Sequence, residues 1–145
     1  MNPSSVSYFG RLLRVPEQSR SARTVELFGW LMLIESPFML VAPRLVASVL
    51  HLPELGEQGA GYFRLAGGLL TVIGLLYTVC GRLNSQSLVF ASMLDRPLVP
   101  GVMALLWWLD LLPGPIALGF SIQDFGSFLW TLHAWRTEVQ APADR

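Results

Sequence analysis

The chain has 145 residues, of which 52% are hydrophobic and 14% are charged, whereas about 25% of an average soluble domain is charged. This deficit of charge indicates a membrane protein. Ten acidic residues balance ten basic ones, so the net charge gives no reason to expect a nucleic-acid partner. All ten basic residues are arginine, which excludes Schiff-base lysine chemistry and a phosphate-loop lysine.

Residues that could carry redox or metal chemistry are scarce. Cys80 is the single cysteine, which excludes enzymes that need a dithiol. The two histidines, His51 and His133, are expected at opposite ends of the domain and cannot ligate one metal or haem together. We therefore expect no metal and no cofactor. No catalytic motif is recognisable, so the sequence gives no positive sign of an enzyme.

Four segments are long and apolar enough to cross a bilayer, whose core of about 30 Å needs about 20 residues per helix. The connections between the second and third segments and between the third and fourth are short, which predicts antiparallel neighbours. The expected fold is all-α, an up-down antiparallel four-helix transmembrane bundle with short interfacial helices. A soluble helical bundle is the alternative, which the composition disfavours. The predicted spans are residues 24–42, 60–80, 86–112 and 115–135.

The segments outside the spans also carry patterns. Residues 1–23 alternate apolar and basic positions before a linker, which predicts a cytoplasmic amphipathic segment on anionic lipid. Pro43 is suited to the first turn of a short helix that Pro53 ends, so an interfacial helix is expected between them. Residues 24–136 form the transmembrane domain and residues 137–145 a cytoplasmic tail.

The arginines predict the orientation. Four of them precede the first span, which places the N-terminus in the cytoplasm under the positive-inside rule. Four spans then return the C-terminus to the same side, and the predicted localisation is the bacterial inner membrane with both termini cytoplasmic. Several aromatic residues near the span ends, Tyr77 among them, are expected to anchor the helices at the interface. The four arginines are Arg11, Arg14, Arg20 and Arg23.

Small residues line one face of the second span. At 100° per residue, Gly67, Thr71, Gly74 and Thr78 share that face. Membrane helices associate through close backbone approach at such residues, so we expect this stripe to pack against a neighbouring helix.

Charged residues inside the spans predict a polar interior. Glu35 and Asp124 are expected at similar depth, and an unpaired carboxylate in hydrocarbon usually faces a cavity or a partner. Either Arg96 neutralises one of these acids, or the two acids share a proton. We regard the three as a candidate ligand-binding or proton-binding site, with plain structural pairing as the alternative. Nearer the outer ends, Arg64 and Asp110 are expected to form an ion pair.

Prolines coincide with these charges. Pro37 is expected to kink the first span beside Glu35, and Pro97 and Pro100 follow Arg96 directly. Irregular backbone at membrane depth is tolerated where protein or water satisfies it, which favours a cavity. On the fourth span the face around Asp124 is small and polar, and consists of Ala117, Ser121, Asp124, Ser127 and Thr131.

Glycine, proline and arginine punctuate the chain at Ala42-Pro43, Leu52-Pro53, Arg64-Leu-Ala-Gly67-Gly68, Gly74-Leu-Leu-Tyr77 and Arg96. This pattern, over roughly residues 24–136, resembles small four-helix bacterial membrane proteins grouped loosely with the DoxX-like families. The resemblance implies an inner-membrane bundle and carries over no catalytic residue. A membrane-embedded Glu35 in the first of four helices is also similar to small multidrug resistance transporters, in which such an acid exchanges protons for cationic drug.

The sequence leads to one leading hypothesis and two alternatives. The leading one is a non-enzymatic membrane protein, surrounded by lipids, whose polar interior binds a small amphipathic ligand or a partner membrane protein. The first alternative is a proton-coupled exporter acting as a homo-oligomer. The second is a lipid-modifying enzyme that uses the acid pair for proton transfer.

Overall fold

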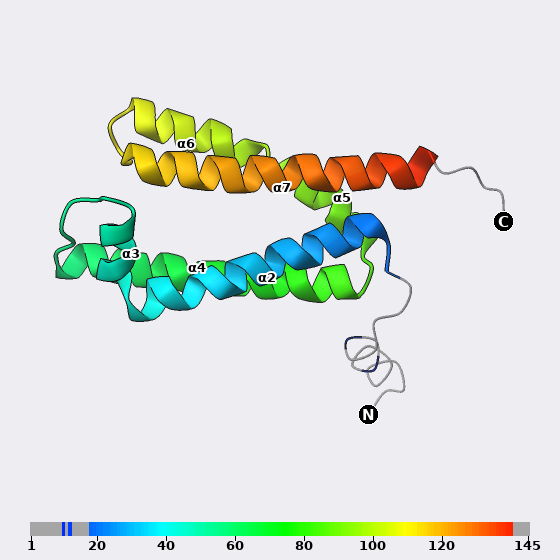
Figure 1. The fold of residues 1–145 in the computed structure, drawn as a ribbon, viewed down its shortest axis with the longest axis horizontal. Helices are drawn as coiled ribbons and strands as arrows, with labels where there is room; N and C mark the ends of the chain where they lie inside the picture. The colour runs from blue at the N-terminus through cyan, green and yellow to red at the C-terminus, as the bar shows by residue number, and fades with distance from the viewer. Residues whose placement is uncertain (1–9, 11, 13–17, 141–145) are drawn as a thin grey trace.

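The described part of the chain is mostly helical. The computed structural model describes Gly10, Leu12 and residues 18–140, and within residues 18–140 it contains six helices and no strand. Figure 1 shows the long helices running along one common direction. The helices are α2 (Arg20–Val41), α3 (Pro43–Val49), α4 (Glu57–Arg82), α5 (Gln86–Asp95), α6 (Leu98–Trp108) and α7 (Gly114–Gln140).

The helix ends differ from the predicted spans by up to five residues, and α6 ends at Trp108, four residues before the predicted end of the third span. The linker expected up to residue 23 gives way to helix at Arg20, because the Ser19 side chain accepts a hydrogen bond from the Ala22 amide and so caps α2. At the other end α7 continues to Gln140, so the tail predicted from residue 137 begins with helix. Most of the predicted amphipathic segment lies outside the described residues.

The third predicted span consists of two helices. α5 ends at Asp95 and α6 begins at Leu98, so Arg96 and Pro97 lie at the break. Proline lacks the amide that would continue the hydrogen-bond ladder, which explains the interruption. By contrast, α2 remains one helix through Pro37. The predicted short helix after Pro43 is present as α3.

Three stretches of helix are long and apolar enough to cross a membrane, namely Arg20–Val41, Glu57–Arg82 and Gln86–Trp108. They indicate a membrane protein. The fourth predicted span, α7, has 27 residues but does not belong to these three. Its length includes Asp124, His133, Arg136 and Glu138, which lower its mean hydropathy.

The tightest packing is between the antiparallel helices α2 and α4. A Cβ added to Gly29 would lie 2.6 Å from the Thr78 amide nitrogen, and one added to Gly74 would lie 3.0 Å from the Gly29 carbonyl oxygen. Gly67 and Gly81 of α4 meet α2 just as closely. Side chains at these positions would force the helices apart, so the glycines set the distance between them.

The remaining long helices form a second layer. α6 and α7 pack on each other, and α7 also packs on α2, whereas α4 contacts neither α6 nor α7 in the described part of the chain. Figure 1 shows α2 with α4 in one layer and α6 with α7 in the other. α5 bridges the layers, because it contacts α2, α4 and α7.

Polar contacts join α2, α4 and α7 at one end of the molecule. The Ser21 amide and hydroxyl donate hydrogen bonds to Glu138 near the end of α7, at 3.1 and 2.6 Å. Beside them, Arg82 Nε donates to Glu26 Oε1 at 2.7 Å, and the Gln18 amide donates to Glu26 Oε2 at 2.8 Å. The start of α2 therefore contacts both the end of α4 and the end of α7.

The glycine packing predicts a contrast between two substitutions. Gly29→Ala should lower the free energy of unfolding by about 1–3 kcal/mol, because the added methyl group meets backbone atoms of α4. Gly68→Ala is the control, since a Cβ there meets nothing within 4 Å. Thermal unfolding in detergent measures both. Equal midpoints for the two variants would contradict the assignment of Gly29 to the helix contact.

Candidate functional site

A cleft separates the two helix layers where α4 and the α6–α7 pair do not touch. It consists of two adjoining cavities of about 270 and 240 Å³, which share Leu70, Phe120 and Gln123 as lining residues. We call these two cavities together the central cleft. Its wall is largely apolar, and the polar side chains in it are Glu35, Tyr77, Asp95, Arg96, Gln123 and Asp124.

Glu35 lines the smaller cavity beside Met39 of the same helix. Its side chain is half-buried, and its Oε2 accepts a hydrogen bond of 2.9 Å from Gln123 Nε2 of α7. This bond crosses the cleft between the two layers. The carboxylate is therefore held by a neutral amide donor.

Asp124 lines the larger cavity from α7 and is 7% exposed. Among the described residues its carboxylate has neither a hydrogen-bond donor nor an ion-pair partner. Burial of an ionised carboxylate without partners is costly, so this group is the least satisfied acid in the cleft.

Arg96 lies at the break between α5 and α6 and is 1% exposed. Its Nη1 donates to the Thr131 hydroxyl at 3.0 Å and to the Ser127 carbonyl at 3.3 Å. Its Cζ lies 4.3 Å from the centre of the Phe28 ring and 5.0 Å from that of Tyr77. Two aromatic faces therefore flank this buried cation.

The aromatic pair is built across the α2–α4 contact. The rings of Phe28 and Tyr77 meet edge to face, with centroids 5.8 Å apart. Tyr77 is 7% exposed and its hydroxyl donates to Asp95 Oδ2 at 2.5 Å. The prediction that Tyr77 anchors the protein at the interface is therefore wrong, because its ring belongs to the core.

The structure brings Glu35, Arg96 and Asp124 to one cleft but does not pair them. Arg96 forms no ion pair with either acid within the described residues, and its Nε and Nη2 have no hydrogen-bond partner there. Nor do the two acids hydrogen-bond to each other, since Glu35 accepts from Gln123. Among the described residues there is thus neither an ion pair of Arg96 with Glu35 or Asp124 nor a hydrogen bond between the two acids.

The expected outer-end ion pair is also absent. Arg64 and Asp110 are both exposed, and no ion pair joins them among the residues that the structure describes. The backbones of α4 and α6 do not approach closely, and Asp110 lies in the turn after α6 with a φ of 55°. At this end of the molecule Arg44 of α3 pairs instead with Glu57 of α4.

Sequence reasoning missed two polar residues of the cleft. Gln123 directly precedes Asp124 but was not included in the small polar face predicted for this helix. In the structure its side chain reaches Glu35. Asp95, which was not among the candidate site residues, also lines the cleft. Thr131 was placed on the correct face, and its contact with Arg96 becomes visible only once α5 and α7 are side by side.

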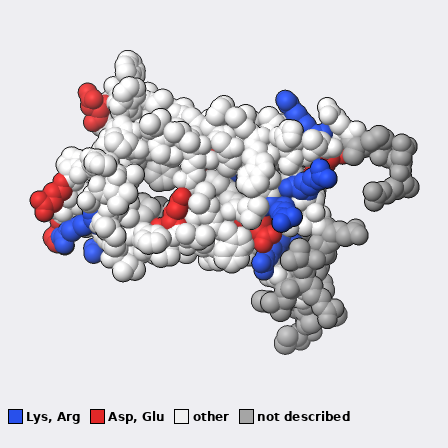
Figure 2. Space-filling model, in the orientation of Figure 1, with Lys and Arg blue, Asp and Glu red and all other residues white. Residues whose placement is uncertain are grey.

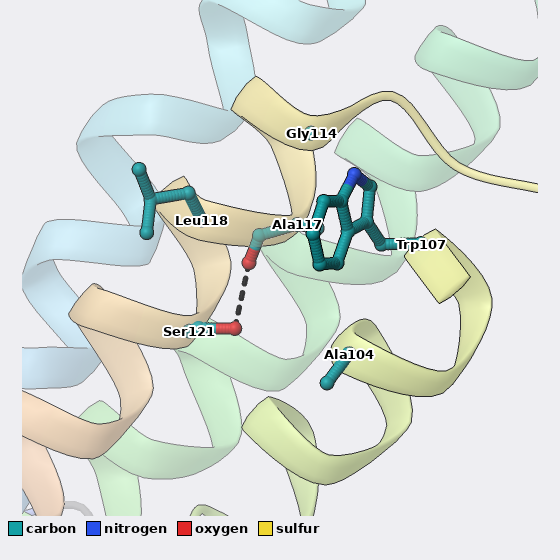
Figure 3. A pocket seen from close by; sticks show the side chains of 6 residues that line it. All are labelled: Ala104, Trp107, Gly114, Ala117, Leu118 and Ser121. Carbon is teal, nitrogen blue, oxygen red and sulfur yellow. Dashed lines mark hydrogen bonds between the residues drawn. The ribbon is translucent and has the colours of Figure 1, made fainter. Parts of the chain in front are cut away.

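A separate cavity of about 380 Å³ lies between α6 and α7 (Figure 3). Its lining is almost wholly apolar, with Trp107 and Leu118 on opposite sides. The Ser121 hydroxyl donates a hydrogen bond of 2.6 Å to the Ala117 carbonyl of the same helix, so its donor is already used. This cavity therefore offers little recognition chemistry.

The described residues contain no group of three His, Cys, Asp or Glu side chains that could hold a metal ion. Searches against models of protein families, against curated proteins and against solved structures found no match for this chain.

The aromatic contact of Arg96 predicts coupling between two substitutions. Phe28→Leu should lower the free energy of unfolding. This loss of stability should be smaller by up to about 2 kcal/mol in an Arg96→Met background, where no cation faces the ring. Unfolding in detergent of the four proteins in this double-mutant cycle measures the coupling. Purely additive losses would show that Phe28 contributes by packing alone. Phe125→Leu is the control, because Phe125 is 46% exposed.

Proposed function

We propose that the chain is a multi-pass protein of the bacterial inner membrane that crosses it four times and keeps both termini in the cytoplasm. The contact between Ser21 and Glu138 supports an even number of crossings, because it joins the start of α2 to the end of α7. α7 is the fourth crossing, and its 27 residues extend about 40 Å. Its polar side chains around Asp124 face other helices and the cleft.

The distribution of arginine supports the orientation. The end of the molecule where α2 starts carries Arg20, Arg23, Arg82 and Arg136, whereas the opposite end carries Arg44 and Arg64. Figure 2 shows that most charged side chains on the visible face gather toward these two ends. Under the positive-inside rule the first end is cytoplasmic.

We further propose that the central cleft binds a small amphipathic ligand and that the protein is not an enzyme. The observation that carries this proposal is the incomplete pairing of Arg96 and Asp124, which both line the larger cavity. Ionisable groups at membrane depth usually face a cavity or a partner and mark function. A ligand with a polar group between these side chains would satisfy both.

The chemistry of the wall supports the amphipathic character of the ligand. Apolar side chains such as Met39, Leu70 and Phe120 predominate, and the few polar groups come from facing helices. Binding sites for small molecules combine such an apolar wall with a small number of fixed polar groups. The apolar part of the ligand would lie against Leu70 and Phe120, and its polar part would approach Gln123 and Asp124.

The four-crossing topology predicts where the termini lie. Green fluorescent protein fused to either terminus should fluoresce, because it matures in the cytoplasm. Alkaline phosphatase fused to either terminus should stay inactive. Activity of the C-terminal phosphatase fusion together with fluorescence of the N-terminal fusion would mean an odd number of crossings and would refute the topology.

The ligand site predicts that purified protein carries a small molecule. Native mass spectrometry in mild detergent should show an adduct on the wild type that is lost in large part from Glu35→Gln and Asp124→Asn. The control is Asp110→Asn, because Asp110 is exposed outside the cleft. Thermal unfolding identifies any variant that fails to fold.

Three outcomes would overturn this function. Equal retention of the adduct by all variants would show that the small molecule does not bind in the central cleft. A homodimer without a bound molecule would favour the exporter if its proteoliposomes exchanged cationic substrates for protons. A stoichiometric second polypeptide would identify an accessory subunit instead of a ligand-binding protein.

A further inference from the structure

A second groove follows the seam between α2 and α7 on the outside of the helix pair. It consists of two adjoining hollows of about 400 and 280 Å³, which share Leu27 and Trp130. We call it the seam groove. It is distinct from the central cleft, with which it shares only Gln123 as a lining residue.

The larger hollow is basic. Arg20 and Arg23 from the first turns of α2 and His133 of α7 line it, and no acidic side chain does. The two hydroxyls nearby are already engaged, since Thr24 donates to the Ser21 carbonyl and Thr137 to the Ala134 carbonyl. Two guanidinium groups on neighbouring turns of one helix match the several oxygens of a phosphate.

The smaller hollow continues along the seam toward the middle of the helices and is apolar. Leu27 and Leu31 form its α2 side, and Gly126 leaves open space on α7, because a Cβ there meets nothing within 4 Å. Trp130 lies where the two hollows join and is 52% exposed. Tryptophan is typical of the boundary between headgroups and acyl chains.

We propose that the seam groove binds an anionic phospholipid, whose phosphate contacts Arg20 and Arg23 and one of whose acyl chains lies along Leu27, Leu31 and Gly126. The order of basic, aromatic and apolar side chains along the groove matches the order of groups in such a lipid. Basic pockets between helices on the cytoplasmic side are suited to anionic headgroups. The inference rests on the membrane placement proposed above and not on the central cleft.

Native mass spectrometry of delipidated protein, mixed with equal amounts of dioleoyl phosphatidylglycerol and dioleoyl phosphatidylcholine, tests the proposal. The wild type should prefer the anionic lipid roughly tenfold, and Arg23→Gln should reduce this preference several-fold. Arg136→Gln is the matched control, because it removes one charge from an exposed position near the same end but outside the groove. Gly126→Leu should weaken binding of both lipids, since it fills the apolar hollow.

Three results would overturn the lipid site. Equal binding of the two lipids would show that the arginines do not select the headgroup. Equal losses of the preference for the anionic lipid in Arg23→Gln and Arg136→Gln would show that this preference comes from general attraction between charges. Displacement of the lipid by inorganic phosphate, with no effect of Gly126→Leu, would identify a site for free anions. None of these results depends on Asp124, so failure here is distinguishable from failure of the cleft.

Discussion

The close approach of α2 and α4 is the constraint on which the rest of the structure depends. Glycines on both helices allow backbone atoms to meet, and this brings Phe28 of α2 against Tyr77 of α4. Their rings form the surface that receives the Arg96 guanidinium. Arg96 in turn hydrogen-bonds to α7, so a contact between two helices determines where a third and a fourth are attached.

The same constraint explains why a cleft exists. α4 uses its small-residue face for α2 and has no contact with α6 or α7 in the described part of the chain, so the second layer is held through α2 and α5. Arg96 contacts aromatic faces and hydroxyl and carbonyl groups, and Asp124 has no ion pair within the part of the chain that the structure describes. An unpaired acid beside an apolar cavity is the arrangement that an amphipathic ligand would complete.

The helices were largely predictable from the sequence, and their partners were not. Apolar length located the helices of all four predicted spans, Pro97 indicated the break beside Arg96, and Pro43 the start of α3. The start of α2 was placed too late because Ser19, its N-cap, was taken as linker. Depth along a helix placed Glu35 and Asp124 in one region, with Arg96 as a candidate partner, but could not say which side chains meet there.

The errors at the site share a physical cause. Positions near the outer ends suggested the pair Arg64 and Asp110, but the backbones of α4 and α6 do not approach closely, and only the packing of whole helices decides that. The position of Tyr77 near the end of a span suggested an interfacial anchor, whereas the glycine contact draws it into the core. Opposite charge suggested an acid as the partner of Arg96, although aromatic rings can stabilise a buried guanidinium.

The most direct test of the central claim is an experimental structure of the protein purified with its native lipids and held in a lipid nanodisc. We expect non-protein density in the central cleft, between Leu70 and Phe120, in contact with Gln123 or Asp124. A structure in which α4 packs directly on α6 and α7, with Asp124 paired to Arg96 and the cleft closed, would contradict this expectation.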